Sequence, residues 1–218
     1  MKLVRLSANC VGPAGNDRLM PLTDADLIQR SWGEPACFAE LFDRHFGAVR
    51  SFCARRMGRD DAEDLAGETF RRAFEHRHRY DLDREDARPW LYGIALNAIR
   101  NTFRSQGRRA VAFARLDVTG PGGVDLAANA ASAVDARRDL AVVIAALREC
   151  PPDEVDALLL HVWEGLSYAD IAVAFSVPVG TIKSRLNRVR GRLRELLDAS
   201  GESSFDTSLR SLRGNHGS

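Results

Sequence analysis

Apolar residues recur every three or four positions through most of the chain, which is the spacing of amphipathic helices. The clearest run lies in residues 36–56, where one face contains Phe38, Leu41, Phe42, Val49 and Phe52. The same period predicts further helices over residues 23–31, 60–77, 87–104, 140–147, 153–163, 167–175 and 177–194. No stretch has the alternating pattern of a β-strand. The pattern therefore predicts an all-α protein.

The helical period breaks between residues 106 and 133, where Gly, Ala and Val are frequent and the run Thr119-Gly120-Pro121-Gly122-Gly123 occurs. This composition is typical of a flexible linker. We therefore expect two small helical domains joined by the linker, residues 23–105 and residues 134–198.

The two ends of the chain lack a sustained period. Residues 1–22 are expected to form a disordered extension, with translation beginning at Met1 or Met20. Residues 199–218, which are rich in Ser and Gly, are expected to form a flexible tail.

The stretch from Val177 to Arg194 combines an apolar seam with a basic face. On a helical wheel at ~100° per residue the seam consists of Ile182, Leu186, Val189 and Leu193. From Lys183 to Arg194 there are six basic residues and no acidic one. A short predicted helix, Ser167–Phe175, and a tight break at residues 176–178 precede it. This order indicates a helix-turn-helix whose second helix enters the major groove of DNA.

Charge is segregated along the chain. The net charge is only +1, yet residues 100–109 and 183–194 are basic and residues 60–68 are acidic. Separate patches of opposite sign indicate more than one kind of partner. One face of the helix predicted over residues 60–77 contains Asp61, Asp64 and Glu68, with Leu65 at the border. The alternative is a solvated face whose acids only favour the helix dipole.

The helix predicted over residues 87–104 is apolar around most of its circumference, which is typical of the central helix of a bundle. Its polar residues fall in a single strip, Asn97, Arg100, Asn101 and Arg104. A strip of only Asn and Arg requires a partner rich in hydrogen-bond acceptors. Phosphates and base edges fit that description, and intramolecular carboxylates are the alternative.

No pattern in the sequence indicates a metal site or a disulfide framework. The four cysteines are widely separated, at Cys10, Cys37, Cys53 and Cys150. They are expected to be reduced, buried thiols of a cytoplasmic protein. The pair His76 and His78 has no further ligand nearby, and His45 lies in an apolar stripe, where a core or boundary histidine is expected.

Other classes of function are also excluded. No phosphate-binding loop and no nucleophile with a plausible base is present, so we expect neither an enzyme nor a cofactor. No run reaches the ~18–20 apolar residues of a membrane span, and no secretory signal is readable.

Two motifs carry a resemblance to a known family. The first combines Asp61-Ala62-Glu63-Asp64-Leu65, Glu68-Thr69-Phe70-Arg71-Arg72-Ala73-Phe74, Pro89-Trp90-Leu91-Tyr92-Gly93-Ile94-Ala95 and Asn97. It resembles region two of bacterial RNA polymerase sigma factors. The second combines Leu166-Ser167-Tyr168-Ala169-Asp170-Ile171-Ala172 with Pro178-Val179-Gly180-Thr181-Ile182-Lys183-Ser184-Arg185, and it is similar to region four. Two domains without region three resemble the extracytoplasmic-function group.

The resemblance implies a role for each of three surfaces. The core-polymerase contact would be made by Asp61, Asp64, Leu65 and Glu68. The melted minus-ten element would be held by Arg79, Tyr80, Arg84, Asn97, Arg100, Asn101 and Arg104, with Tyr80 stacking on a base. The minus-thirty-five element would be contacted by Thr181, Lys183, Ser184, Arg185, Asn187 and Arg188. Of these, Asn187 and Arg188 would read bases, and Lys183 and Arg185 would bind mainly phosphates.

The resemblance therefore implies a transcription initiation factor whose partners are core RNA polymerase and promoter DNA. An anti-sigma factor is a further candidate partner, and the free protein is expected to be a monomer. The alternative is a self-contained helix-turn-helix regulator with a sensing domain at its N-terminus. That alternative predicts a dimer, for which the sequence offers no additional helix after Leu197.

Overall fold

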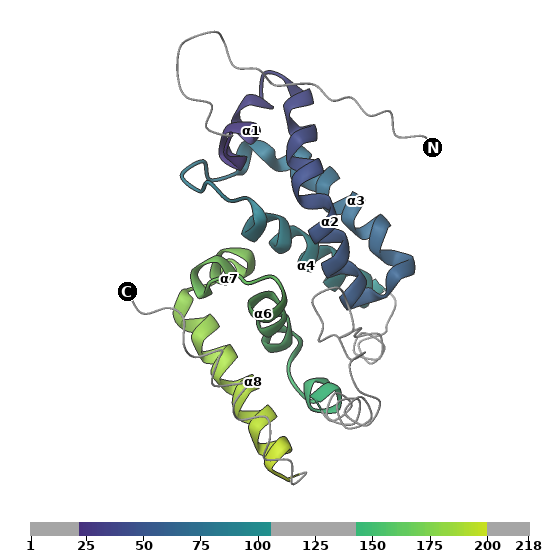
Figure 1. Ribbon diagram of the computed structural model, residues 1–218, viewed down its shortest axis with the longest axis vertical. Helices are drawn as coiled ribbons and strands as arrows, with labels where there is room; N and C mark the ends of the chain where they lie inside the picture. Colours follow the sequence, from purple (N-terminus) through teal and green to yellow (C-terminus); the bar gives the residue numbers. More distant parts are fainter. Residues whose placement is uncertain (1–21, 106–142, 200–218) are drawn as a thin grey trace, which may run out of the picture. The chain divides into compact units, whose positions relative to one another are not determined.

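The structure is a computed structural model that describes residues 22–105 and 143–199, and every regular element in these two ranges is a helix (Figure 1). The prediction of an all-α protein is confirmed. The chain divides into two compact units, Met1–Arg108 and Arg109–Ser218. The linker expected over residues 106–133 lies outside the described residues, as do nearly all of the two expected terminal extensions.

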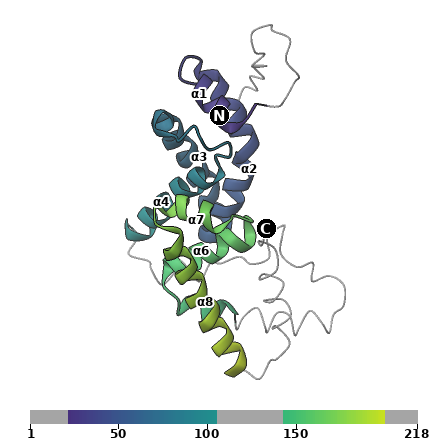
Figure 2. The same cartoon turned by 90° about the vertical axis from the view of Figure 1, so that its left-hand side faces the viewer.

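The N-terminal unit is a small bundle. Its elements are α1 (Asp24–Arg30), the 3₁₀ turn η1 (Pro35–Cys37), α2 (Phe38–Met57), α3 (Arg59–His76), the 3₁₀ turn η2 (Arg77–Arg79) and α4 (Arg88–Ser105). Helices α2 and α3 lie side by side and α4 packs against both, as Figures 1 and 2 show from two directions. The side chains of Leu41, Phe52 and Leu91 are fully buried between them. The predicted helices are thus found to within one or two residues.

The turn between α2 and α3 is made by Gly58. Its φ of 90° lies in the left-handed region, which side chains disfavour and glycine adopts freely. Gly58 ends α2, and it is also the residue before α3. Helix α3 begins at Arg59, so that Asp60 and Asp61 lie in its first turn.

The C-terminal unit contains the expected helix-turn-helix. A helical segment at residues 143–148 is followed by α6 (Pro152–Trp163), α7 (Tyr168–Phe175) and α8 (Val179–Ala199), and these three helices pack on one another. Ser167 starts α7 through a capping box with Asp170. The apolar seam of α8 is buried along its whole predicted length, through Ile182, Leu186, Val189 and Leu193.

Three of the four cysteines lie in the described ranges; Cys37, Cys53 and Cys150 are buried, as predicted, and none of them forms a disulfide there. No helix in those ranges is long and apolar enough to cross a membrane. Nor do the described residues place three or more potential metal ligands together.

Candidate nucleic-acid interface

The polar strip of α4 lies on the open side of a buried helix. Ala95, Leu96, Ala98 and Ile99 are at most 4% exposed, whereas the Asn97, Asn101 and Arg104 side chains are exposed and that of Arg100 is half-buried. Arg104 Nη1 donates a hydrogen bond to Asn101 Oδ1 at 3.4 Å. The strip therefore offers amide and guanidinium groups on a backbone that the bundle holds in place.

The environment of Tyr80 differs from the expected one. Its ring was expected to be presented for stacking, but it is 6% exposed and packs on Trp90, with the ring centres 5.0 Å apart. Its hydroxyl donates to the carbonyl of Arg84 at 2.6 Å. Burial, followed by the negative charges of Asp24 and Asp86, raises the pKa of Tyr80 above its ordinary value. In this structure Tyr80 is a core residue that shapes the loop before α4.

The remaining predicted residues of that loop are accessible. Arg79 is exposed on η2. Arg84 forms an ion pair with Asp81 at 3.3 Å, and 41% of its side chain is exposed. The loop thus presents two arginines around the buried ring of Tyr80.

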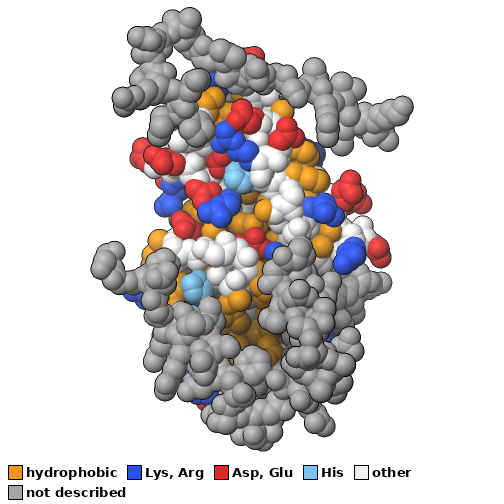
Figure 3. All heavy atoms as spheres, viewed as in Figure 1, with side chains coloured by type: hydrophobic (Ala, Val, Ile, Leu, Met, Phe, Trp, Pro, Cys, Tyr) orange, Lys and Arg blue, Asp and Glu red, His pale blue; other side chains and the backbone are white. Residues whose placement is uncertain are grey.

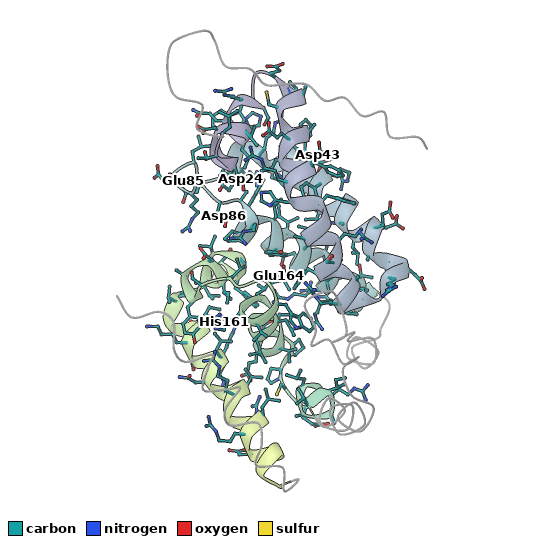
Figure 4. The ribbon with its side chains drawn as sticks, in the orientation of Figure 1. Asp24, Asp43, Glu85, Asp86, His161 and Glu164 are labelled. Carbon is teal, nitrogen blue, oxygen red and sulfur yellow. The ribbon has the colours of Figure 1, made fainter. Side chains whose placement is uncertain are left out.

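The loop is tied to α1 and α2 by the buried carboxylate of Asp24. Oδ2 of Asp24 accepts a hydrogen bond from the Ala87 backbone N–H at 3.0 Å and lies 2.7 Å from His45 Nε2. The backbone N–H of Asp24 donates to the carbonyl of Glu85 at 3.1 Å, and Figure 4 labels both residues where α1 meets the loop. Arg44 Nη1 reaches Oδ1 at 3.3 Å. His45 is therefore a paired boundary histidine, as expected.

The electrostatics of Asp24 follow from these contacts. Burial alone would raise the pKa of its carboxyl. The hydrogen bonds from His45, the Ala87 backbone and Arg44, together with the charge of His45, outweigh burial and lower the pKa below the ordinary value of 3.8. Asp24 is therefore ionised near neutral pH and holds the loop as a carboxylate.

The face of α3 that was predicted to be acidic presents less exposed negative charge than its sequence suggested. Asp64 is exposed and Asp61 is half-buried, but Leu65, expected at the border, is only 8% exposed and packs inward. The Glu68 carboxylate accepts hydrogen bonds from Arg71 and Arg72 at 2.6–2.8 Å. These bonds lower the pKa of Glu68 to about 2.

Acidic and basic side chains are accordingly interspersed on the face of the N-terminal unit drawn in Figure 3. Of the three acids predicted for this face, Asp64 is exposed, whereas Asp61 and Glu68 are half-buried. The surface is thus a mixed one, in which acidic side chains alternate with basic ones.

The outer face of α8 is exposed, as the wheel predicted. The Lys183, Ser184, Asn187 and Arg188 side chains are exposed, and that of Thr181 is half-buried near the start of the helix. The backbone N–H of Thr181 donates to the carbonyl of Pro178 at 2.9 Å. Four of the predicted contact residues therefore lie on one accessible side.

Arg185 has a different environment. It was expected to bind phosphate, but its side chain is only 17% exposed, and Nη2 lies 3.0 Å from a carboxylate oxygen of Asp153 on α6. Its guanidinium carbon also lies 5.2 Å from the centre of the Phe175 ring on α7. In this structure Arg185 joins the three helices of the C-terminal unit.

Sequence reasoning missed the acids that face α8. Asp153 and Glu154 follow Pro151-Pro152 and were interpretable only as acids in the first turn of a helix. In the structure Glu154 is 3% exposed, and its two oxygens accept hydrogen bonds from Arg188 and Arg192. Arg188, which was predicted to read bases, is therefore also part of an internal ion pair.

Two family models match the chain in the same order as the two units. Sigma-70 region 2 matches residues 41–109, and Sigma-70, region 4 matches residues 140–193. Both matches include the surfaces described above, and together they cover more than half of the chain.

Individual relatives match over most of their own length. The ECF RNA polymerase sigma-E factor of Haemophilus influenzae is 34% identical over 179 residues, which are 78% of this chain and 92% of that protein. RNA polymerase sigma factor CnrH of Cupriavidus metallidurans is 30% identical over 191 residues, 82% of this chain and 97% of that protein.

Two solved structures have a similar fold. CnrH in complex with the cytosolic domain of CnrY gives a TM-score of 0.54 at 29% identity, covering 81% of this chain and 99% of that one. The sigma factor RpoE in complex with the anti-sigma factor NepR, from Bartonella quintana, gives a TM-score of 0.53 at 26% identity, covering 74% of this chain and 96% of that one.

Proposed function

The chain belongs to the extracytoplasmic-function (ECF) group of RNA polymerase sigma factors, and we propose that its three surfaces each make one contact of transcription initiation. As a member of this family it binds core RNA polymerase and directs it to promoters. The phosphodiester chemistry belongs to the polymerase, in the cytoplasm. A self-contained regulator would have no need of sigma-70 region 2, so that alternative is set aside.

The observation that most directly supports this assignment of contacts to surfaces is the exposure of the two predicted DNA-contacting faces. Asn97 and Asn101 on α4, and Asn187 and Arg188 on α8, point outward from helices whose opposite faces are buried. Amides and guanidinium groups are the side chains that pair with base edges. The α4 strip would bind unstacked bases of the minus-ten element, and α8 would bind duplex DNA at the minus-thirty-five element.

The assignment is tested by run-off transcription with core polymerase and the full chain on a library of genomic promoters. We expect defined start sites that depend on the chain, and no transcripts from the same templates with core polymerase alone. Confirmed binding to core polymerase without transcription from any template would overturn the proposal.

The α3 face is proposed as the surface that docks on core polymerase. Replacing the exposed Asp64 by arginine is expected to weaken that binding about 5- to 10-fold, chiefly by slowing association, because a surface charge at an interface steers the encounter. The affinity is measured by titrating labelled core polymerase. The matched control is Asp43→Arg, the same reversal at an exposed acid of α2. Equal effects of the two changes would contradict the assignment.

Lys183 is proposed to contact phosphate and not bases. Lys183→Ala is expected to weaken binding by the reconstituted holoenzyme to all minus-thirty-five sequences by a similar factor. It should also reduce the slope of log affinity against log salt concentration by about one. Filter binding across a salt series measures both quantities. A change in base preference would show instead that Lys183 reads sequence.

A protein antagonist is proposed as a further partner. Both solved relatives described above are complexes, one with the cytosolic domain of CnrY and one with the anti-sigma factor NepR. Sequestration of the α3 face or the α4 strip would be enough to prevent initiation. Co-purification of the tagged chain from its own host tests this proposal.

A further inference from the structure

The buried carboxylate of Glu154 on α6 holds two arginines of α8. Oε1 accepts a hydrogen bond from Nε of Arg188 at 2.6 Å, and Oε2 accepts one from Nη1 of Arg192 at 2.7 Å. Only 5% of the Glu154 side chain is exposed. A carboxylate removed from water to this degree is stable only when it is paired. Glu154 is therefore a fixed point against which the longer arginine side chains are ordered.

Arg188 is held at a second point as well. Its Nη1 donates to Oγ of Ser184, one helical turn earlier, at 3.0 Å. A guanidinium has five N–H groups. The three N–H groups of Arg188 that do not bond to Glu154 or Ser184 make no hydrogen bond with any residue in the described ranges. The side chain is also 53% exposed. Arg188 is thus anchored by part of its guanidinium while the rest is open to solvent.

This arrangement suits base recognition. An arginine that reads guanine must direct two donors at O6 and N7 in one plane. A guanidinium already fixed by a carboxylate loses less freedom when it binds than one on a mobile stem. Lys183 and Asn187, which lie on the same face, have no such anchor among the described residues.

We propose that Glu154 is a positioning residue for promoter recognition, whose carboxylate orients the Arg188 guanidinium toward one base pair of the minus-thirty-five element. This inference rests on the proposed function, because it requires α8 to read duplex DNA. Arg192 has a structural role: it donates a hydrogen bond to the second oxygen of Glu154 and thereby joins α6 to α8. The opposite possibility is that Glu154 only masks positive charge, and it leads to a different experimental result.

The test uses the full chain assembled with core polymerase and a promoter library randomised in the minus-thirty-five element. Bound DNA is selected and sequenced for the wild type and for Glu154→Gln. We expect the preference at one base pair to fall about 5- to 10-fold in the variant, while preferences at the other positions are kept. The position that changes should be the one that Arg188→Ala also affects.

Two further variants separate positioning from stability. Arg192→Ala breaks the other half of the same pairing, and Glu195→Gln removes an exposed carboxylate of α8. Both are expected to retain the base preference, and thermal unfolding of each variant measures the accompanying loss of stability. If Arg192→Ala changes the preference as much as Glu154→Gln does, the effect is structural and the positioning role is overturned.

The failure of this inference can be told from the failure of the proposed function. A wild-type holoenzyme without any preference in the minus-thirty-five element would overturn both. A selective wild type together with an equally selective Glu154→Gln would overturn only the positioning role. The positioning role would also be overturned if Glu154→Gln bound matched and mismatched DNA more tightly by the same factor. That result would show that Glu154 masks positive charge.

Discussion

Replacing Asp24 by alanine is expected to lower the free energy of unfolding of the N-terminal unit by about 3–5 kcal/mol. The carboxylate is buried and accepts hydrogen bonds from the Ala87 backbone and Arg44, with His45 at 2.7 Å. Its removal takes away the acceptor of the buried Ala87 N–H and the partner of His45, whereas Arg44 keeps its hydrogen bonds to the Leu22 carbonyl and to Glu40. Denaturant unfolding followed by circular dichroism measures the change. The exposed Asp43 provides the control, and Asp43→Ala should change the stability by less than about 0.5 kcal/mol.

The same carboxylate predicts a dependence of stability on pH. Because the pKa of Asp24 is lower in the folded chain than its ordinary value of 3.8, the unfolded chain binds the proton more readily. The contribution of Asp24 is therefore fully present above about pH 5 and is lost as the pH falls through the folded pKa. Asp24→Asn should remove this contribution, so the stability difference between wild type and variant should shrink below pH 4. A constant difference from pH 6 to pH 3 would show that the Asp24 carboxylate is not the group that matters.

The positions of the helices could be predicted because each helix has its own buried face. In α8, Ile182, Leu186 and Val189 repeat at the helical period and are fully buried. Caps and breaks at Ser167 and Gly58 are equally local signals. Where nearby residues in the sequence decide which side chains are buried and where a helix ends, the hydrophobic pattern alone is sufficient to predict the helix.

The partners of the charged side chains could not be predicted in this way. Arg188 and Glu154 are 34 residues apart, and Asp24 and Ala87 are 63 residues apart. A helical wheel gives the direction of a side chain, but it does not indicate which residue of another helix faces it. Long arginine side chains also reach several possible acceptors. The exposed face of α8 was thus predicted, whereas the division of its arginines between internal pairs and free donors was not.

The environment of Tyr80 was missed for a related reason. Tyr80 is the one aromatic in the stretch from Arg79 to Arg88, and the resemblance implied that its ring stacks on a base. In the structure Trp90, ten residues later, covers its ring, and the hydroxyl is bound within the loop. Burial of a loop aromatic depends on the next helix, which the local pattern does not contain.

Arg188→Ala is expected to have the largest effect on promoter choice of any single change in α8. If the guanidinium makes a bidentate contact with one guanine, its loss reduces discrimination at that base pair by about 1–3 kcal/mol, or roughly 5- to 150-fold. Holoenzyme binding to matched and singly mismatched promoter fragments measures the change. Affinity for mismatched fragments should fall much less, because phosphate contacts by Lys183 and the rest of α8 are kept.

The stability of the variant decides how that result is interpreted. Arg188→Ala removes the partner of Glu154 Oε1, but Arg192 still satisfies Oε2, so we expect the C-terminal unit to lose only about 1 kcal/mol. The buried seam of α8 does not involve Arg188 and should hold the helix in place. A relaxed preference with a nearly unchanged melting temperature would therefore identify a base contact. Unaltered promoter choice would instead mean that Arg188 serves only the internal pair, and that Asn187 is the principal reader of the groove.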